Sequence, residues 1–171
     1  MSKGLVNKMI EEKAIQISIF DNEESILKKR KQNALEYITA GNATFTIETK
    51  KYDEGYTYKM VHDTRDKCEH RYKVYRMFGA DNENDYTFIG IYYKDTGTYK
   101  SKAPKDNKPL YDRLLAAFLK MLHTENEPWY DTCKFYKSIN CAVCGRKLTT
   151  PESIERGIGP ECYEKLKNKG V

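Results

Sequence analysis

The sequence lacks any long hydrophobic run. No apolar stretch approaches the ~20 residues that a helix needs to cross a bilayer. Residues 1–20 also lack the charged start and apolar middle of a secretion signal, because Glu11, Glu12 and Lys13 interrupt them. We therefore expect a cytoplasmic protein with no membrane partner, and the sequence shows no internal repeat or low-complexity segment.

Familiar catalytic motifs are missing as well. There is no phosphate-binding glycine loop, no serine elbow and no paired-carboxylate motif. His123 lies ahead of Cys141 and Cys144, as in zinc deaminases, but the proline before the first cysteine is absent and Cys162 would be a surplus ligand. We predict a protein that is not an enzyme, with a zinc-dependent hydrolase as the remaining enzymatic alternative.

Charge is plentiful but only slightly unbalanced. The 171 residues include 30 Lys and Arg against 25 Asp and Glu, a net charge of +5, and the mean hydropathy is −0.80. This excess is spread along the chain, so it permits contact with nucleic acid without demanding it. The length suits one globular domain with a small appended module.

The first clear element is a helix. Residues 22–40 are rich in helix formers, and Gly41 supplies a stop. Residues 1–21 before it form an N-terminal arm or helix in our interpretation. The helix carries a basic run that could contact phosphate, although such runs are more often solvated. The run consists of Lys28, Lys29, Arg30 and Lys31.

After Gly41 the apolar period changes to two, which indicates strands. Phe45 and Ile47 alternate with polar residues, and a second alternating run at 56–60 follows the turn residues 53–55. Runs at 72–78, 86–93 and 98–102 have similar content. We therefore predict an antiparallel sheet of about five strands.

From residue 110 onward, leucine and phenylalanine repeat at helical spacing, which predicts a helix that covers one face of this sheet. The predicted fold class is α+β. The predicted domains are an α+β domain over residues 22–124 and a zinc-binding module over 125–171, joined by a linker with Pro128 and Trp129.

The five cysteines point to metal rather than disulfides in a reducing compartment. Cys141 and Cys144 are three positions apart, as in a zinc knuckle, and Gly145 can adopt the positive φ needed next. Cys162 follows Pro160, which favours the first turn of a helix. A knuckle facing a helix start predicts a treble-clef-like module with zinc as the cofactor.

Tetrahedral zinc needs a fourth ligand. We prefer Cys133, which lies eight positions before Cys141, over His123 at the end of a helix. Cys133 could instead be a small buried residue. Less favoured candidates are Cys68, His62 and His70.

Between the two halves of the site, Thr150, Pro151 and Gly157 predict a short capped helix. Beside the knuckle, Arg146 and Lys147 could contact a nucleic-acid backbone, or could simply be solvated.

The run from Cys141 to Cys162, with Cys-x-x-Cys-Gly-Arg-Lys-Leu-Thr and then Gly-Ile-Gly-Pro-x-Cys, resembles the C-terminal signature of an uncharacterised family found in phages and their bacterial hosts. Residues 44–46 and 79–90 are more loosely similar to the sheet domain that accompanies it. In that family a histidine often precedes the first cysteine, whereas this chain has residues 136–138, Tyr-Lys-Ser, there. The resemblance implies metal binding and a mobile-element setting.

Fourteen tyrosines are unusual. Four of them, Tyr72, Tyr75, Tyr92 and Tyr93, could form a base-stacking platform or could pack beneath a helix. Our first hypothesis is a non-enzymatic, phage-like module that binds DNA or RNA. The alternative is a phage-encoded inhibitor of a host protein or defence complex, in which zinc is purely structural. The partner, the oligomeric state and the functional surface stay open.

Overall fold

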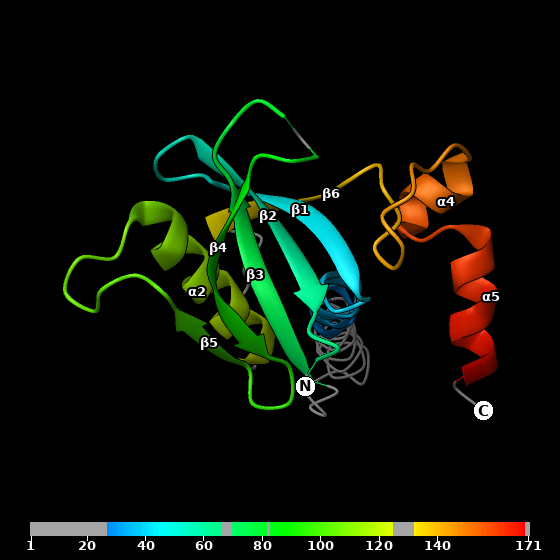
Figure 1. The fold of residues 1–171 in the computed structure, drawn as a ribbon, viewed down its shortest axis with the longest axis horizontal. Helices are drawn as coiled ribbons and strands as arrows, with labels where there is room; N and C mark the ends of the chain where they lie inside the picture. The colour runs from blue at the N-terminus through cyan, green and yellow to red at the C-terminus, as the bar shows by residue number, and fades with distance from the viewer. Residues whose placement is uncertain (1–26, 66–69, 82, 125–131, 170–171) are drawn as a thin grey trace, which may run out of the picture.

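The computed structural model describes residues 27–65, 70–81, 83–124 and 132–169. These residues form an α+β fold in which helices pack on one face of an antiparallel sheet, with two short helices at the C-terminal end (Figure 1). The predicted arm at residues 1–21 and the predicted linker residues Pro128 and Trp129 lie outside the described residues.

The sheet has six strands in the order β5-β4-β3-β2-β1-β6. Every neighbouring pair is antiparallel. The strands are β1 Asn42–Thr49, β2 Glu54–His62, β3 Arg71–Met77, β4 Tyr86–Tyr93, β5 Thr98–Ser101 and β6 Cys133–Lys137. The first five confirm the strands predicted from the alternating pattern.

One face of the sheet is the core face. Along β1, the residues at alternate positions from Ala43 to Thr49 are buried and those between them are only partly covered. Phe45, Tyr58 and Phe118 are at most 1% exposed and lie at the centre of the core. Because strand side chains alternate between faces, this pattern leaves the opposite face only partly covered.

Two helices cover the core face. The helix that runs through residues 27–38 contributes Ala34, Tyr37 and Ile38 to the core. The helix α2, Leu110–His123, contributes four further buried residues with helical spacing, namely Leu115, Phe118, Leu119 and Leu122. Figure 1 shows α2 behind the sheet, so the near face of the sheet carries no helix in this view. No helix among the described ranges is long and apolar enough to span a membrane.

The sixth strand lies in the segment that we assigned to the zinc-binding module. β6 pairs with β1 from Phe45↔Lys137 to Thr49↔Cys133. The sheet therefore continues beyond residue 124, and the short chain from Lys137 to Cys141 connects its edge strand directly to the knuckle.

A buried carboxylate joins α2 to β5. Asp112 is fully buried, and its Oδ1 accepts a hydrogen bond from the hydroxyl of Tyr99 at 2.8 Å. Its Oδ2 is also buried and accepts no hydrogen bond from the described residues. The hydrogen bond from the Tyr99 hydroxyl therefore satisfies an oxygen of this buried carboxylate.

Replacing Tyr99 by phenylalanine should reduce the free energy of unfolding by about 1–3 kcal/mol, because it leaves a buried acceptor unsatisfied. Tyr136→Phe is the matched control, since its hydroxyl bonds Glu48 at 3.0 Å at an exposed position. Urea unfolding followed by circular dichroism measures both. Equal midpoints for the two variants would contradict the prediction.

Candidate functional site

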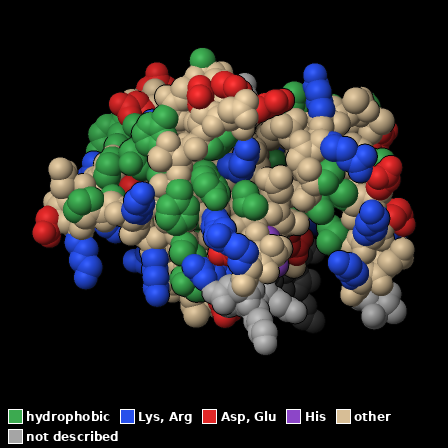
Figure 2. All heavy atoms as spheres, in the orientation of Figure 1, with side chains coloured by type: hydrophobic (Ala, Val, Ile, Leu, Met, Phe, Trp, Pro, Cys, Tyr) green, Lys and Arg blue, Asp and Glu red, His purple; other side chains and the backbone are tan. Residues whose placement is uncertain are grey.

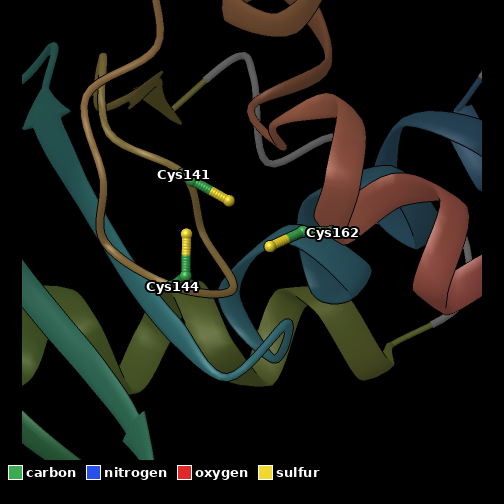
Figure 3. Close-up of side chains that lie close together, drawn as sticks. All are labelled: Cys141, Cys144 and Cys162. Atoms are coloured by element: carbon green, nitrogen blue, oxygen red, sulfur yellow. The ribbon is translucent and has the colours of Figure 1, made fainter.

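The first half of the candidate metal centre is a tight turn. The Cys141 amide donates to the Arg146 carbonyl at 2.8 Å, and the Gly145 amide donates to the Cys141 carbonyl at 2.8 Å. Gly145 has a φ of +76°, a conformation that favours glycine. The predicted knuckle is therefore present, and it places the side chains of Cys141 and Cys144 on the same side of the turn (Figure 3).

The second half is the start of a helix. α5 spans Pro160–Lys169 and places Cys162 in its first turn, as predicted. Before it, α4 spans Pro151–Arg156, with Thr150 accepting a hydrogen bond from the Ser153 amide and Gly157 ending the helix at a φ of +77°. The Gly159 amide also donates to the sulfur of Cys141 at 3.3 Å. These caps fix the position of α5 relative to the knuckle.

The three thiols converge. The sulfur atoms of Cys141, Cys144 and Cys162 all lie within 4.8 Å of one another, and Figure 3 shows them pointing toward a common centre. Three thiolates at about 2.3 Å from a tetrahedral ion would be about 3.8 Å apart, so small movements of the side chains would close the cluster on a metal. The residues fit a thiolate-bound metal ion.

Electrostatics differ among the thiols. Burial acts to raise the pKa of Cys144. Hydrogen bonds from the backbone and side chain of Arg146 and from the other two thiols together outweigh this effect and lower the pKa to about 7. Burial and hydrogen bonding with Cys144 raise the pKa of Cys162 to about 11. Cys144 therefore offers a thiolate near neutral pH, and a bound cation would displace the proton of Cys162.

The structure places Cys133 away from this cluster. Cys133 is 1% exposed, belongs to the main core and pairs with Thr49 across the sheet. Burial raises its pKa, which disfavours the thiolate that a metal requires. The fourth ligand predicted from the sequence is thus not among the grouped thiols, and the alternative of a small packing residue describes its surroundings.

The histidine candidates are also elsewhere. His123 lies 2.6 Å from the hydroxyl of Tyr92 through its Nε2, and burial lowers its pKa. His62 packs against the ring of Tyr72 at 5.3 Å. Neither His62, His70 nor His123 joins the thiol group, and Cys68 lies outside the described residues.

The module is held against the sheet. Ala142, between the two knuckle cysteines, is fully buried in the main core, and the Asn42 amide donates to its carbonyl at 2.6 Å. The Ala142 amide donates to the Gly157 carbonyl at 2.9 Å, and Ile158 packs on both the main core and the small core of the module. The metal centre and the sheet therefore share one packed interface.

The partly covered face of the sheet is the second feature of interest. The register of the strands places two rows of side chains on this face. The first row is Thr44, Lys59, Tyr75 and Phe88, and the second is Asn42, Val61, Lys73, Ile91 and Lys100. Figure 2 looks onto this face and shows Lys and Arg side chains among hydrophobic ones.

Cationic and aromatic groups are in direct contact on this face. Lys59 lies 4.1 Å from the ring centroid of Tyr86, and Lys100 lies 5.1 Å from that of Tyr93. Tyr75 and Phe88 form an edge-to-face pair with centroids 5.8 Å apart. The surface combines positive charge with half-buried rings.

The four-tyrosine platform predicted from the sequence is divided between the two faces. Tyr72 and Tyr92 are 5% and 0% exposed in the core, so they cannot stack with an external base. Tyr75 and Tyr93 lie on the partly covered face, where Phe88 and Tyr86 join them. Lys73, two positions before Tyr75, lies on the same face of β3, and this spacing was a sequence signal for the basic and aromatic face.

The other predicted contact residues have mixed surroundings. Lys28, Lys29 and Arg30 are exposed. Lys31 is only 8% exposed and donates a hydrogen bond to the Thr124 carbonyl, so it connects its helix to the end of α2 and does not face an external phosphate.

Beside the metal centre, Arg146 forms an exposed ion pair with Glu161 at 2.8 Å, and Lys147 lines a groove next to the sheet.

Comparison with known proteins gives a match to part of the chain. Residues 138–167, which contain all three grouped cysteines, match the model of a family of unknown function, DUF6011. No curated protein and no solved structure matches the chain. The match agrees with the resemblance to an uncharacterised family and covers the candidate metal centre.

Proposed function

We propose that the chain is a non-enzymatic, cytoplasmic nucleic-acid-binding module whose C-terminal centre holds a structural zinc ion. Zinc is the proposed metal because thiolate-rich sites with helix and knuckle ligands suit it. The observation that supports nucleic acid as the partner is the basic and aromatic composition of the partly covered sheet face.

The charges on this face favour an anion. Lys59, Lys73 and Lys100 lie on it, and Arg71 lies beside Lys73. Asp63 is the buried acid beneath them, 3.3 Å from Lys73 and 3.7 Å from Arg71. Glu83 is a second acid beside this face, since it lines the groove next to β1. Four cations against these two carboxylates leave a positive surface, which is the electrostatic signature of phosphate binding.

A structural rather than catalytic role for the metal is supported by the pocket of about 180 Å³ beside the thiols. Its one carboxylate, Glu161, is paired with Arg146, and two of its hydroxyls, those of Thr150 and Ser153, bond each other at 2.8 Å. The carboxylate that a hydrolase would use as acid or base is therefore already engaged with a cation.

The alternative of an inhibitor that binds a host protein has less support. Ile139, Ile154 and Leu166 are exposed on the module, but single exposed apolar side chains are ordinary on protein surfaces. We therefore prefer nucleic acid as the partner.

The proposal predicts oligonucleotide binding that weakens steeply between about 50 and 200 mM salt. Replacing both Lys59 and Lys100 by glutamine should reduce the slope of log K against log salt by about 1.4, since each phosphate contact on a single strand contributes about 0.7. Fluorescence anisotropy with labelled single-stranded and duplex DNA and RNA measures this.

The matched control removes the same two charges from α2, on the covered side of the sheet, by Arg113→Gln and Lys120→Gln. Both residues are exposed, so folding should be unaffected. An equal loss of slope in the two double variants would point to net charge alone, and no binding to any probe at low salt would refute the proposed function.

A further inference from the structure

We infer that the ligand is a single-stranded nucleic acid whose bases stack on Tyr75 and Phe88 and whose chain continues into the groove between β1 and the cysteine knuckle. This inference rests on the proposed function and adds to it the form of nucleic acid and the path that the strand takes.

The aromatic pair is placed for stacking. Tyr75 and Phe88 are directly opposite each other on β3 and β4, on the face that carries no helix in the described residues. Their interplanar angle is 70°, so the ring that contributes its edge keeps both of its own faces free of its partner. Base stacking on such rings tolerates any sequence, since every base has a π-face.

A cation adjoins the pair. Lys59 is the cross-strand partner of Tyr75, so the row runs from the rings to a positive charge and then to Thr44 on β1. Strands lie about 4.8 Å apart, so the row from Phe88 to Thr44 spans about 14 Å, enough for two or three nucleotides on a sheet.

The row ends at a groove. A groove of about 470 Å³ separates β1 and β2 from the knuckle, which is within the usual size of small-ligand sites. Its lining includes Thr44, Thr46, Thr57, Tyr86, Asn140 and Lys147. It has one carboxylate, Glu83, against two ammonium groups, those of Lys137 and Lys147. Hydroxyl, amide and ammonium groups of this kind hydrogen-bond with base edges, sugars and phosphates.

The β-bulge adds to the shape of this surface. The register shifts between Val74 and Tyr75, so Ile89 of β4 has no partner on β3. Ile89 is buried in the core, and the shift turns Phe88 to the same face as Tyr75. Without the bulge, Phe88 would be on the core face with Gly90, and the aromatic pair would not form.

An edge-to-face pair of rings beside a groove suits an unpaired strand. Bases in a duplex are stacked on each other and present only their edges, so they cannot lie on Tyr75 or Phe88. The preference for a single strand over duplex therefore distinguishes this inference from general attraction to phosphate.

The test uses the full chain and an oligonucleotide of about 16 nucleotides that contains the fluorescent base 2-aminopurine, whose emission is quenched by stacking. Tyr75→Leu should weaken single-strand binding about 5- to 100-fold and abolish the quenching, because one base loses its stacking partner. Tyr75→Phe keeps the ring and should bind like the wild type.

Tyr52→Leu is the matched control, because Tyr52 is 52% exposed in the turn between β1 and β2. Thermal unfolding of each variant shows whether it is folded, and Phe88→Leu gives a second measurement of the same contact.

Equal binding of duplex and single strand, with Tyr75→Leu and Phe88→Leu unchanged, would overturn this inference and leave the proposed function standing. Loss of binding by Tyr75→Phe as well as Tyr75→Leu would also overturn stacking, since the ring would not be what matters. No binding of any nucleic acid would overturn the proposed function itself.

Discussion

Replacing Cys144 by serine should abolish tight metal binding and unfold the residues around the centre, while the sheet stays folded. Cys144 supplies one of the three converging sulfur atoms and carries the lowest pKa shown for them. Serine has no thiolate to offer, so a three-sulfur site becomes a two-sulfur site.

The size of the effect follows from the small core of the module. Its buried residues are Cys141, Leu148 and Cys162, two of which are themselves metal ligands in our proposal. Structural zinc in modules of this size contributes on the order of 10 kcal/mol to folding. A core this small cannot replace such a contribution, whereas the sheet has a large core of its own.

Elemental analysis of the purified protein measures the metal content, and hydrogen exchange measures the protection of backbone amides in each element. We expect one zinc ion per chain in the wild type and none in Cys144→Ser, with faster exchange in α4 and α5 and unchanged protection in β2 and β3. An unchanged metal content and melting profile in Cys144→Ser would refute a structural metal.

Cys133→Ala is the control variant, since it removes a thiol from the same end of the chain without touching the cluster. It should keep one zinc ion per chain. Loss of zinc from Cys133→Ala would restore Cys133 as the fourth ligand and would require β6 to rearrange on metal binding.

The position of Cys133, outside the group of three thiols, could not be predicted from the sequence. Eight positions separate Cys133 from Cys141, which suggested that both could contact one ion. In the structure, β6 is extended, and a strand rises about 3.3 Å per residue, so its five residues carry Cys133 about 13 Å from Lys137. The pairing of β6 with β1 is a contact between distant segments, and its short sequence does not announce it.

Local signals, in contrast, predicted the module well. Thr150, Pro151 and Gly157 specify α4 through a side-chain cap, a first-turn proline and a left-handed end, all of which act within a few residues. The knuckle turn and the start of α5 are local in the same sense. The grouping of the three cysteines therefore followed from short-range chemistry.

The aromatic surface lies between these cases. The alternation of Tyr72 and Val74 with Lys73 and Tyr75 separates the two faces of β3, and this separation is readable from the sequence. The register shift at Ile89, which moves Phe88 to the other face, cannot be read from the sequence. A bulge depends on how the strand pairs with its partner, and this pairing is a contact between separate segments.

The second large effect is expected at Gly157, where the module meets the sheet. Gly157 ends α4 with a φ of +77°, and a Cβ at this position would lie 2.4 Å from Cε2 of Tyr37. Gly157→Ala therefore combines a strained backbone with a clash against a buried ring. We expect it to lower the free energy of unfolding by about 2–5 kcal/mol, from about 1–2 for the left-handed conformation and about 1–3 for overpacking.

Tyr37 cannot move away cheaply. Its hydroxyl donates to the Thr44 carbonyl at 2.9 Å and accepts from the Ser138 amide at 3.0 Å, so it joins β1 to the chain between β6 and the knuckle. Its ring also packs edge-on against Phe135 at 6.0 Å. Displacing the ring would break these contacts and loosen the module from the sheet.

Gly159→Ala is a closely matched control, two residues further along. A Cβ there would meet the Cδ2 of Leu148 at 3.5 Å and the sulfur of Cys141 at 3.9 Å, which are ordinary contacts, and Gly159 is not among the glycines with positive φ. Urea unfolding of zinc-loaded protein should show a large loss for Gly157→Ala and a small change for Gly159→Ala. Equal stability of the two variants would mean that the module is not held to the sheet through Tyr37. A selective loss would show that the interface between the module and the sheet is built around this glycine.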